Sequence, residues 1–449
     1  MARRDKKARF RPPAGETFRL TLESLSHQGN AIARRDGQVV FAAFGIPGEE
    51  VDVLVERAYP DYLEGVVTAV HAPSPGRVTP RCEYFGVCGG CQLQHIDYAE
   101  QLSLKTEVVK EQMRRIGHLP DVPVLPAIGA AEPWYYRNHA RFSVDRDGFL
   151  GFVMRGRRRV LRIENCYIMQ PAILEVLHAL QRPVEGVPVS VPAEAEALAV
   201  GAPGAPISHA DDSETADVPR EKGRLPRLHQ LAVRVGVHTG ERLVQPDIAA
   251  FAPEIPSGQT SYEETLCGER FRVSAPSFFQ VNTAQAETLI RLAREGLALT
   301  SEDLLLDAYA GVGTFAKVLA RDVREVLAIE VSASSVADGK YNTRDLPNVR
   351  WIEGEVERVL PELDVRPTAV VLDPSRQGCA PPALDALIAA RVPRIAYVSC
   401  EPTTLARDLR TLVDGGYAVR GVQPVDLFPQ TYHIECVALL ERSARSDER

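Results

Sequence analysis

Short apolar runs alternate with helix-length segments from about residue 270 onward. The runs are LLLDAYAG, EVLAIEVS, NVRWIEG, AVVLDPSR and IAYVSCEP. Strands separated in this way by helices pair into a parallel sheet that helices cover on both faces, and ligands bind at the carboxyl ends of such strands. We therefore expect residues 266–442 to form an α/β domain with a Rossmann-like, parallel-rich sheet.

The N-terminal part of the chain has a different texture. Residues 14–73 alternate apolar and polar side chains between glycine-containing turns, which predicts a small OB-like barrel of about five strands. Residues 74–265 hold a cysteine-rich segment, a helix ending near Gly117 and irregular strand-like chain. Within them, residues 183–227 lack hydrophobic periodicity and are expected to form a disordered insertion. The sequence thus predicts three domains.

Composition narrows the class of protein. Hydrophobic residues make up 45% and charged residues 25% of the 449, as in ordinary globular proteins. No apolar run approaches the roughly 18 residues of a membrane span, and the N-terminal segment lacks the apolar stretch of a secretory signal. We expect a cytoplasmic protein without membrane association, and nothing in the sequence calls for an obligate protein partner.

Charge is unevenly distributed. The net charge is −8, yet residues 1–170 hold 24 basic and 20 acidic residues, which leaves 28 and 40 for the rest. Because phosphate binding needs local positive charge, the N-terminal part is where a polyanion would bind. Residues 134–142 and 155–159 interleave aromatic and basic side chains there, a mixture that suits stacking on RNA bases or, alternatively, a solvated charged face.

A glycine turn follows the first of the apolar runs. In DAYAGVGTFA, Gly311 and Gly313 would let the backbone approach a ligand at a helix N-terminus, and Glu330 ends the next run, where a carboxylate can accept both hydroxyls of a ribose. This pattern fits either NAD or S-adenosylmethionine. The leading Asp307 and the residues downstream favour S-adenosylmethionine.

Three further residues at run ends suit methyl transfer to a base. Asp373 could accept the N3–H of a uracil, although it could instead cap a turn. Cys400 precedes a helix, whose dipole is expected to favour its thiolate. Glu435 precedes the last apolar run and would act with them. Gln280 offers an amide to cofactor or base, and Asn282 beside it could instead be a helix cap.

Four cysteines form a candidate metal centre. Cys82, Cys88 and Cys91 lie within ten residues, and Cys166 is the nearest other cysteine. Four thiolates suit zinc or a 4Fe-4S cluster equally by count. A triplet with a remote fourth ligand favours the iron–sulfur cluster, because zinc sites usually show two close pairs.

These motifs resemble those of the bacterial RNA uracil-5-methyltransferases that carry a TRAM domain and an iron–sulfur centre, and within that family the 23S rRNA branch. The resemblance rests on PRCEYFGVCGGCQLQH, YRNHARF, FFQVN, DAYAGVGTF, LDPSR, YVSCEPTTLARDL and HIECVALL, and spans nearly the whole chain outside residues 183–227. It implies a class I methyltransferase domain, S-adenosylmethionine and a 4Fe-4S cluster as cofactors, and RNA as the substrate, with 23S rRNA favoured over tRNA.

The resemblance also implies residue roles. Cys400 would add to uracil C6 and Glu435 would remove the C5 proton. The residues implied to line the cofactor and base site are Gln280, Tyr309, Glu330, Glu355 and Asp373, beside the turn glycines Gly311 and Gly313. The implied cluster ligands are Cys82, Cys88, Cys91 and Cys166.

The chain departs from the family pattern at three positions. Ala310 stands where cysteine is frequent, Ser375 where proline or alanine is common, and Glu401 where asparagine is usual. A carboxylate at Glu401 is expected to disfavour the neighbouring thiolate. If it silenced the thiol, a non-catalytic RNA-binding protein would result.

The motifs are compatible with three further activities. A tRNA uridine methyltransferase would have the same catalytic half, and a cytosine C5 methyltransferase would differ near the N3 of the base. An NAD-dependent iron–sulfur oxidoreductase would use the glycine turn and the cysteines, but it would leave Cys400 and Glu435 without a role.

Overall fold

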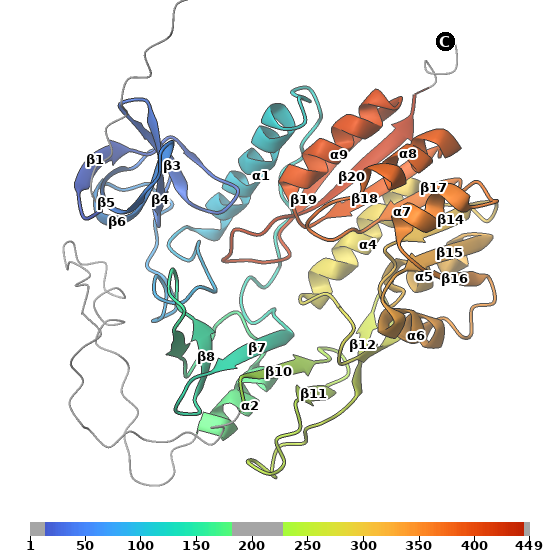
Figure 1. Cartoon of the computed structure of the whole chain (residues 1–449), viewed down its shortest axis with the longest axis horizontal. Helices are drawn as coiled ribbons and strands as arrows, with labels where there is room; N and C mark the ends of the chain where they lie inside the picture. The colour runs from blue at the N-terminus through green and yellow to red at the C-terminus, as the bar shows by residue number, and fades with distance from the viewer. Residues whose placement is uncertain (1–13, 182–227, 444–449) are drawn as a thin grey trace, which may run out of the picture.

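The computed structural model describes residues 14–181 and 228–443 (Figure 1). The segment expected to be a disordered insertion, residues 183–227, lies outside the described residues. Within the described part of the chain, none of the helices has the length and apolar character needed to span a membrane.

The N-terminal part forms one curved sheet. It has six strands rather than the expected five, in the order β1-β5-β6-β4-β3-β2, and β1 also contacts β3. The two long strands β5 and β6 alternate buried and accessible side chains, which gives the sheet a closed apolar core. The strands are β1 (Thr17–Thr21), β2 (Ser24–Leu25), β3 (Ala31–Arg35), β4 (Gln38–Ala43), β5 (Glu50–Ala58) and β6 (Tyr62–Ala72).

The middle of the chain forms a second, antiparallel sheet with strand order β11-β10-β7-β8-β9. Helix α2 (Pro171–Gln181) packs its apolar side on this sheet. A separate hairpin, β12 (Ser261–Leu266) and β13 (Glu269–Ser274), follows. The strands of the antiparallel sheet are β7 (His139–Val144), β8 (Leu150–Val153), β9 (Val160–Arg162), β10 (Gln230–Val235) and β11 (Arg242–Gln245).

The C-terminal part holds the expected parallel-rich sheet. Its seven strands follow the order β16-β15-β14-β17-β18-β20-β19, and only the pairs made by β20 are antiparallel. The chain reverses its winding direction between β14 and β17, which is where open α/β sheets bind ligands. The strands are β14 (Leu304–Ala308), β15 (Glu325–Glu330), β16 (Val349–Glu353), β17 (Ala369–Leu372), β18 (Arg394–Ser399), β19 (Tyr417–Val425) and β20 (Glu435–Arg442).

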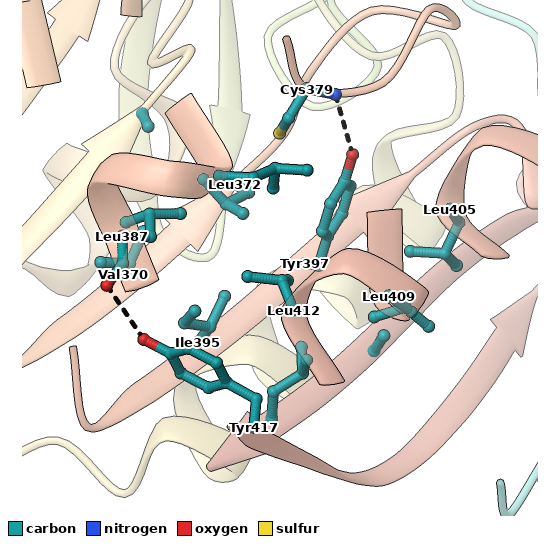
Figure 2. Packing of buried hydrophobic residues seen from close by; sticks show 14 of the residues in the cluster. Val370, Leu372, Cys379, Leu387, Ile395, Tyr397, Leu405, Leu409, Leu412 and Tyr417 are labelled. Atoms are coloured by element: carbon teal, nitrogen blue, oxygen red, sulfur yellow. Dashed lines mark hydrogen bonds between the residues drawn. The ribbon is translucent and has the colours of Figure 1, made fainter. Parts of the chain in front are cut away.

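Helices cover both faces of this sheet. Because side chains alternate along each strand, one apolar set packs against α4 and α5 and the other against α1 (Tyr98–Arg115), α8 and α9. On the second face, Tyr397 accepts a hydrogen bond from the Cys379 main-chain N–H at 3.2 Å and packs among leucines of α9 (Figure 2). The helices are α4 (Thr283–Leu297), α5 (Thr314–Leu319), α6 (Ala333–Asn342), α7 (Val356–Val359), α8 (Pro381–Ala390) and α9 (Pro402–Asp414).

Helix α1 (Tyr98–Arg115) joins the parts of the chain. Although it lies in the segment assigned to the middle domain, its residues Val108, Val109 and Met113 pack into the core of the C-terminal sheet, against α9 and β19 (Figure 1). Its fully buried Lys105 donates to Asp426 at 2.6 Å. An ion pair withdrawn from water in this way fixes the two elements in one arrangement.

Candidate active site

The expected site residues gather at one edge of the C-terminal sheet. Asp373 follows β17 and Cys400 follows β18, at the carboxyl ends of these strands. Glu435 is the first residue of β20, which runs antiparallel to β18 and pairs Cys436 with Ser399. Three segments that are distant in sequence therefore place a thiol and two carboxyl groups together.

The glycine turn takes the expected conformation after β14. Gly311 and Gly313 have φ values of 56° and 87°, which glycine adopts without strain. The Gly311 N–H donates to the Glu330 carboxylate at 2.9 Å, and that carboxylate also accepts from Ser332 N–H at 2.7 Å. Glu330 is thereby fixed beside the turn. Tyr309 has a φ of 66°, unusual for a residue with a side chain, and marks this turn as conformationally constrained.

A buried carboxyl group underlies the turn. Asp307 accepts from the Ala316 N–H at 2.7 Å, at the start of α5, while its second oxygen has no hydrogen-bond partner among the described residues. Burial raises the pKa of Asp307 to about 8, and the nearby Asp373 and Glu330 contribute to the rise. Through its bond to Ala316, Asp307 therefore fixes the start of α5 beside the glycine turn.

The electrostatics of the thiol differ from the expectation. Burial raises the pKa of Cys400 to about 12, and the negative charges of Glu435 and Asp373 contribute to the rise. The expectation that the thiol would favour its thiolate is not met, because burial and the two carboxyl groups raise its pKa. The resting thiol is protonated.

Glu401 has a different role from the one expected for it. Its side chain accepts from the Thr403 N–H at 3.4 Å and caps α9. The carboxylates that raise the thiol pKa most are Glu435 and Asp373. Glu401 is therefore a helix cap, a role that asparagine, the usual residue at this position, could also fill.

Both carboxyl groups beside the thiol are also held toward their neutral forms. Burial raises the pKa of Asp373 to about 7. Burial, with the charge of Asp373, raises the pKa of Glu435 well above its ordinary value. Arg376 is the cation that opposes the shifts of Cys400 and Glu435, because its positive charge lowers the pKa of each.

The sequence places the Arg376 guanidinium at the same strand end as Asp373, and the structure brings it into contact with His433, which the sequence indicates is a structural residue rather than the base. The Arg376 guanidinium lies 3.1 Å from Nδ1 of His433. Burial and this positive charge lower the pKa of His433 to about 4, so the imidazole is neutral. The signal for Arg376 was its place three residues after a strand-end carboxylate, in LDPSR, but its partner lies 57 residues away in sequence.

The remaining expected residues lie around this edge in different ways. Gln280 is held by its main-chain oxygen, which accepts from the Asn138 amide at 3.1 Å. Asn282 is the N-cap of α4 and accepts from Gln285 N–H at 3.3 Å, so the helix-cap interpretation is confirmed. Glu355 precedes α7 and pairs with Arg358 at 2.6 Å, with 42% of its side chain exposed.

The four cysteines of the candidate metal centre lie around one cavity. Cys82, Cys88, Cys91 and Cys166 line a single cavity of about 310 Å3, together with apolar side chains such as Phe85 and Met169. Burial raises the pKa of Cys82 to about 12 and that of Cys166 to about 11, and neighbouring cysteines add to both shifts. Within residues 14–181 and 228–443, however, no group of three or more histidine, cysteine or acidic side chains has the arrangement to hold a metal ion.

Comparison with known proteins agrees with this architecture. The TRAM domain family matches residues 14–68, and the family described as tRNA (Uracil-5-)-methyltransferase matches residues 267–358 and 360–443. An uncharacterized RNA methyltransferase of Gloeobacter violaceus is 36% identical, over 96% of this chain and 97% of its own. A second uncharacterized RNA methyltransferase, from Thermosynechococcus vestitus, is 32% identical over 96% of this chain and 99% of its own.

A solved structure shares the whole fold. The tRNA (uracil-54, C5)-methyltransferase of Pyrococcus abyssi, solved with S-adenosyl-L-homocysteine, superposes with a TM-score of 0.69 at 23% identity, over 94% of this chain and 99% of its own. Given the identity and coverage of the relatives, the chain belongs to the TRAM-containing RNA uracil-5-methyltransferase family and is an RNA methyltransferase. Family membership decides against the NAD-dependent oxidoreductase and the non-catalytic RNA-binding protein.

The raised pKa of Asp373 predicts a pH-dependent stability. The folded-state pKa of Asp373 is about 7, above the value of about 3.9 in the unfolded chain. Its contribution to the free energy of unfolding is therefore complete when the pH is below the unfolded pKa, and it is lost as the pH rises through 7. We expect Asp373→Asn to be more stable than the wild type, with an advantage that grows by about 2 kcal/mol between pH 5 and pH 8. Urea unfolding at both pH values measures it.

The control for this experiment is Asp385→Asn, on the exposed side of α8. This variant should follow the wild type at both pH values. If the gain in free energy of unfolding of Asp373→Asn over the wild type were the same at pH 5 and pH 8, it would contradict the assignment of a raised pKa to Asp373.

Proposed function

We propose that this protein transfers a methyl group from S-adenosylmethionine to C5 of a uridine in RNA, in the cytoplasm. The observation that carries the proposal is the meeting of Cys400, Glu435 and Asp373 at the ends of β17, β18 and β20. A thiol and two carboxyl groups are what a covalent methylation of uracil requires. Family membership supplies the reaction class and the RNA substrate.

The cofactor would bind at the switch point of the sheet. We assign Gly311, Gly313 and Glu330 to the adenosine end, where a fixed carboxylate can accept ribose hydroxyls. The other residues that we assign to the cofactor and base site are Tyr309, Gln280, Glu355 and Asp373. The Pyrococcus abyssi enzyme, which has the same fold, was solved with the demethylated cofactor.

Uracil must be activated before it can accept a methyl group, since its C5 is a poor nucleophile. We assign Cys400 as the nucleophile: its sulfur adds to C6, and the electron pair of the C5–C6 double bond then attacks the sulfonium methyl. Glu435, which must be ionised at this stage, removes the C5 proton, and elimination of the thiolate restores the ring. The thiol passes its proton to solvent as sulfur adds to C6, and the charge of Arg376, which lowers the pKa of Cys400, favours the anion.

A base reaches this site only after leaving its stack. We assign residues 14–73 and the aromatic and basic residues of the middle domain, 74–265, to RNA binding, and residues 266–442 to methyl transfer. Arg81 lies over the rings of Trp134, Tyr135 and Tyr167, at 5.3, 5.3 and 4.8 Å from their centroids. Such a group offers flat faces and positive charge to RNA.

We further propose that the four cysteines hold a 4Fe-4S cluster. Their convergence on one cavity with apolar walls supports this assignment. A cluster separates its four ligands by a cube of iron and sulfide, so it requires a wider arrangement than the tetrahedral site of one zinc ion.

The proposed RNA is 23S rRNA, which the combination of a TRAM domain and a cysteine centre favours. A uridine of tRNA is the second candidate. It is supported by the Pyrococcus abyssi tRNA enzyme, whose fold matches nearly the whole of this chain. Cytosine is a poorer fit, because a ring without an N3–H would not pair with the ionised form of Asp373.

The catalytic assignment predicts opposite outcomes for two variants incubated with RNA and cofactor. Cys400→Ala should lose methylation by at least about 10³-fold and form no covalent complex, while still binding S-adenosylmethionine. Glu435→Gln should accumulate a methylated RNA adduct that survives denaturing electrophoresis. Turnover by Cys400→Ala would remove the nucleophile from the mechanism, and absence of the adduct with RNA binding preserved would remove the base.

The target assignment predicts one missing methyl group per substrate site in cells that lack the protein. Mass mapping of 23S rRNA and tRNA should show loss of 5-methyluridine from 23S rRNA, and the purified protein should restore it. Loss confined to tRNA would instead establish the second candidate.

The cluster assignment predicts about four iron and four sulfide per chain in protein purified without oxygen, with a broad visible absorption band. Cys166→Ala should lose most of both. Cys267→Ala, which alters an exposed cysteine outside the cavity, should lose neither. One zinc per chain, or no metal in wild-type protein, would refute the assignment.

A further inference from the structure

The loop between β19 and β20 determines where Glu435 begins its strand. Val425, the last residue of β19, pairs with Glu435, the first residue of β20, so residues 426–434 form a closed hairpin loop. The loop also carries His433, which contacts Arg376. A displacement of this loop would therefore move both Glu435 and His433.

Gln430 lies at the tip of this loop and is buried, with 3% of its surface exposed. Its side-chain oxygen accepts from the Gln101 amide at 3.0 Å, and its main-chain N–H donates to the Gln101 side-chain oxygen at 3.2 Å. Its φ is 71°, a left-handed conformation that residues other than glycine rarely adopt. Strain of this kind persists only where the surroundings impose it.

The main chain of Gln430 contacts residues 82–93, which hold Cys82, Cys88 and Cys91 and are called the cysteine segment below. Its carbonyl accepts two hydrogen bonds, from the N–H groups of Gln92 at 3.1 Å and Leu93 at 3.0 Å. These residues directly follow Cys91. The left-handed conformation is what turns the carbonyl toward them while the side chain faces Gln101 on α1.

Other parts of the chain also meet this loop. The Tyr136 hydroxyl, in the middle domain, donates to the Pro429 carbonyl at 3.0 Å. In the N-terminal sheet, Gly29 lies so close to Tyr432 that a Cβ at Gly29 would stand 2.8 Å from the Tyr432 Cβ. Contacts from both N-terminal parts therefore converge on the loop that leads to the base.

The path from the tip to the site is short. Thr431 N–H donates to the Phe428 carbonyl at 3.2 Å, and His433 N–H donates to the Thr431 hydroxyl at 3.3 Å. These bonds leave the segment between Gln430 and His433 little freedom to absorb a displacement of the tip.

We propose that Gln430 is a positioning residue that links the cysteine segment to the catalytic base. Its carbonyl holds the loop against residues 92–93, its side chain holds the loop against α1, and Glu435 is placed for proton removal as a result. This role rests on the proposed function of Glu435. It predicts that a shift of the cysteine segment slows removal of the C5 proton without weakening RNA binding.

Two substitutions separate the carbonyl contact from the side-chain contact. Gln430→Gly accepts the positive φ, so the carbonyl stays in place and only the amide is lost. Gln430→Val disfavours the positive φ, so the carbonyl turns away as well. Gln423→Ala is the matched control, because Gln423 lies on β19 and donates to main-chain oxygens of Pro126 and Pro424, away from the cysteine segment.

We expect kcat of Gln430→Val to fall about tenfold or more, with KM for RNA and cofactor unchanged, because the base is displaced and not the binding surface. The covalent RNA adduct should accumulate in this variant, since Cys400 still adds. Gln430→Gly should lose only a few-fold. Hydrogen exchange of the peptide containing Gln92 and Leu93 should accelerate in Gln430→Val and stay slow in Gln430→Gly and Gln423→Ala.

Two results would overturn the proposal. One is a Gln430→Val variant with kcat within about twofold of the wild type. The other is a loss of kcat in Gln430→Val with a raised KM for RNA and no adduct, which a general structural defect would produce. Failure of the proposed function is distinguishable, because the wild-type protein would then neither methylate RNA nor form an adduct, whereas the exchange of residues 92–93 would still report the loop contact.

Discussion

The antiparallel pairing of β18 and β20 is the constraint on which the site depends. All other strands next to β14, β17 and β18 run parallel, and their carboxyl ends alone would supply Asp373 and Cys400. Only a strand that runs the opposite way can bring its first residue, Glu435, to that same edge. The hairpin from β19 to β20 therefore completes a site that the parallel strands begin.

Placing these groups together has an electrostatic consequence. A thiol and two carboxyl groups, partly or wholly removed from water, are close enough for their charges to add to the effect of burial, and all three are held toward their neutral forms. The charged state of the site is therefore unfavourable, and the surrounding fold must stabilise it. The guanidinium of Arg376 is the compensating charge, and it is exposed to solvent beside His433.

The three parts of the chain are joined at buried polar contacts and not only through linkers. Lys105 of α1 pairs with Asp426, Gln101 bonds Gln430, and Tyr136 bonds the carbonyl of Pro429. Polar groups buried in this way are costly unless each finds its partner, so they specify one arrangement of the parts. The arrangement places residues 92–93, next to Cys91, and the turn between β2 and β3 against the loop that leads to Glu435.

Local patterns were enough to predict the parallel-rich sheet, the glycine turn and the strand-end positions of Asp373, Cys400 and Glu435, because hydrophobic periodicity and strand ends are properties of short segments. They also indicated that four cysteines would meet. The sixth strand of the N-terminal sheet, the packing of α1 on the C-terminal sheet, the protonated state of Cys400, the contact of Arg376 with His433 and the place of Gln430 emerged only from the folded chain. Each of these depends on burial or on partners tens to hundreds of residues away, and no local pattern records them.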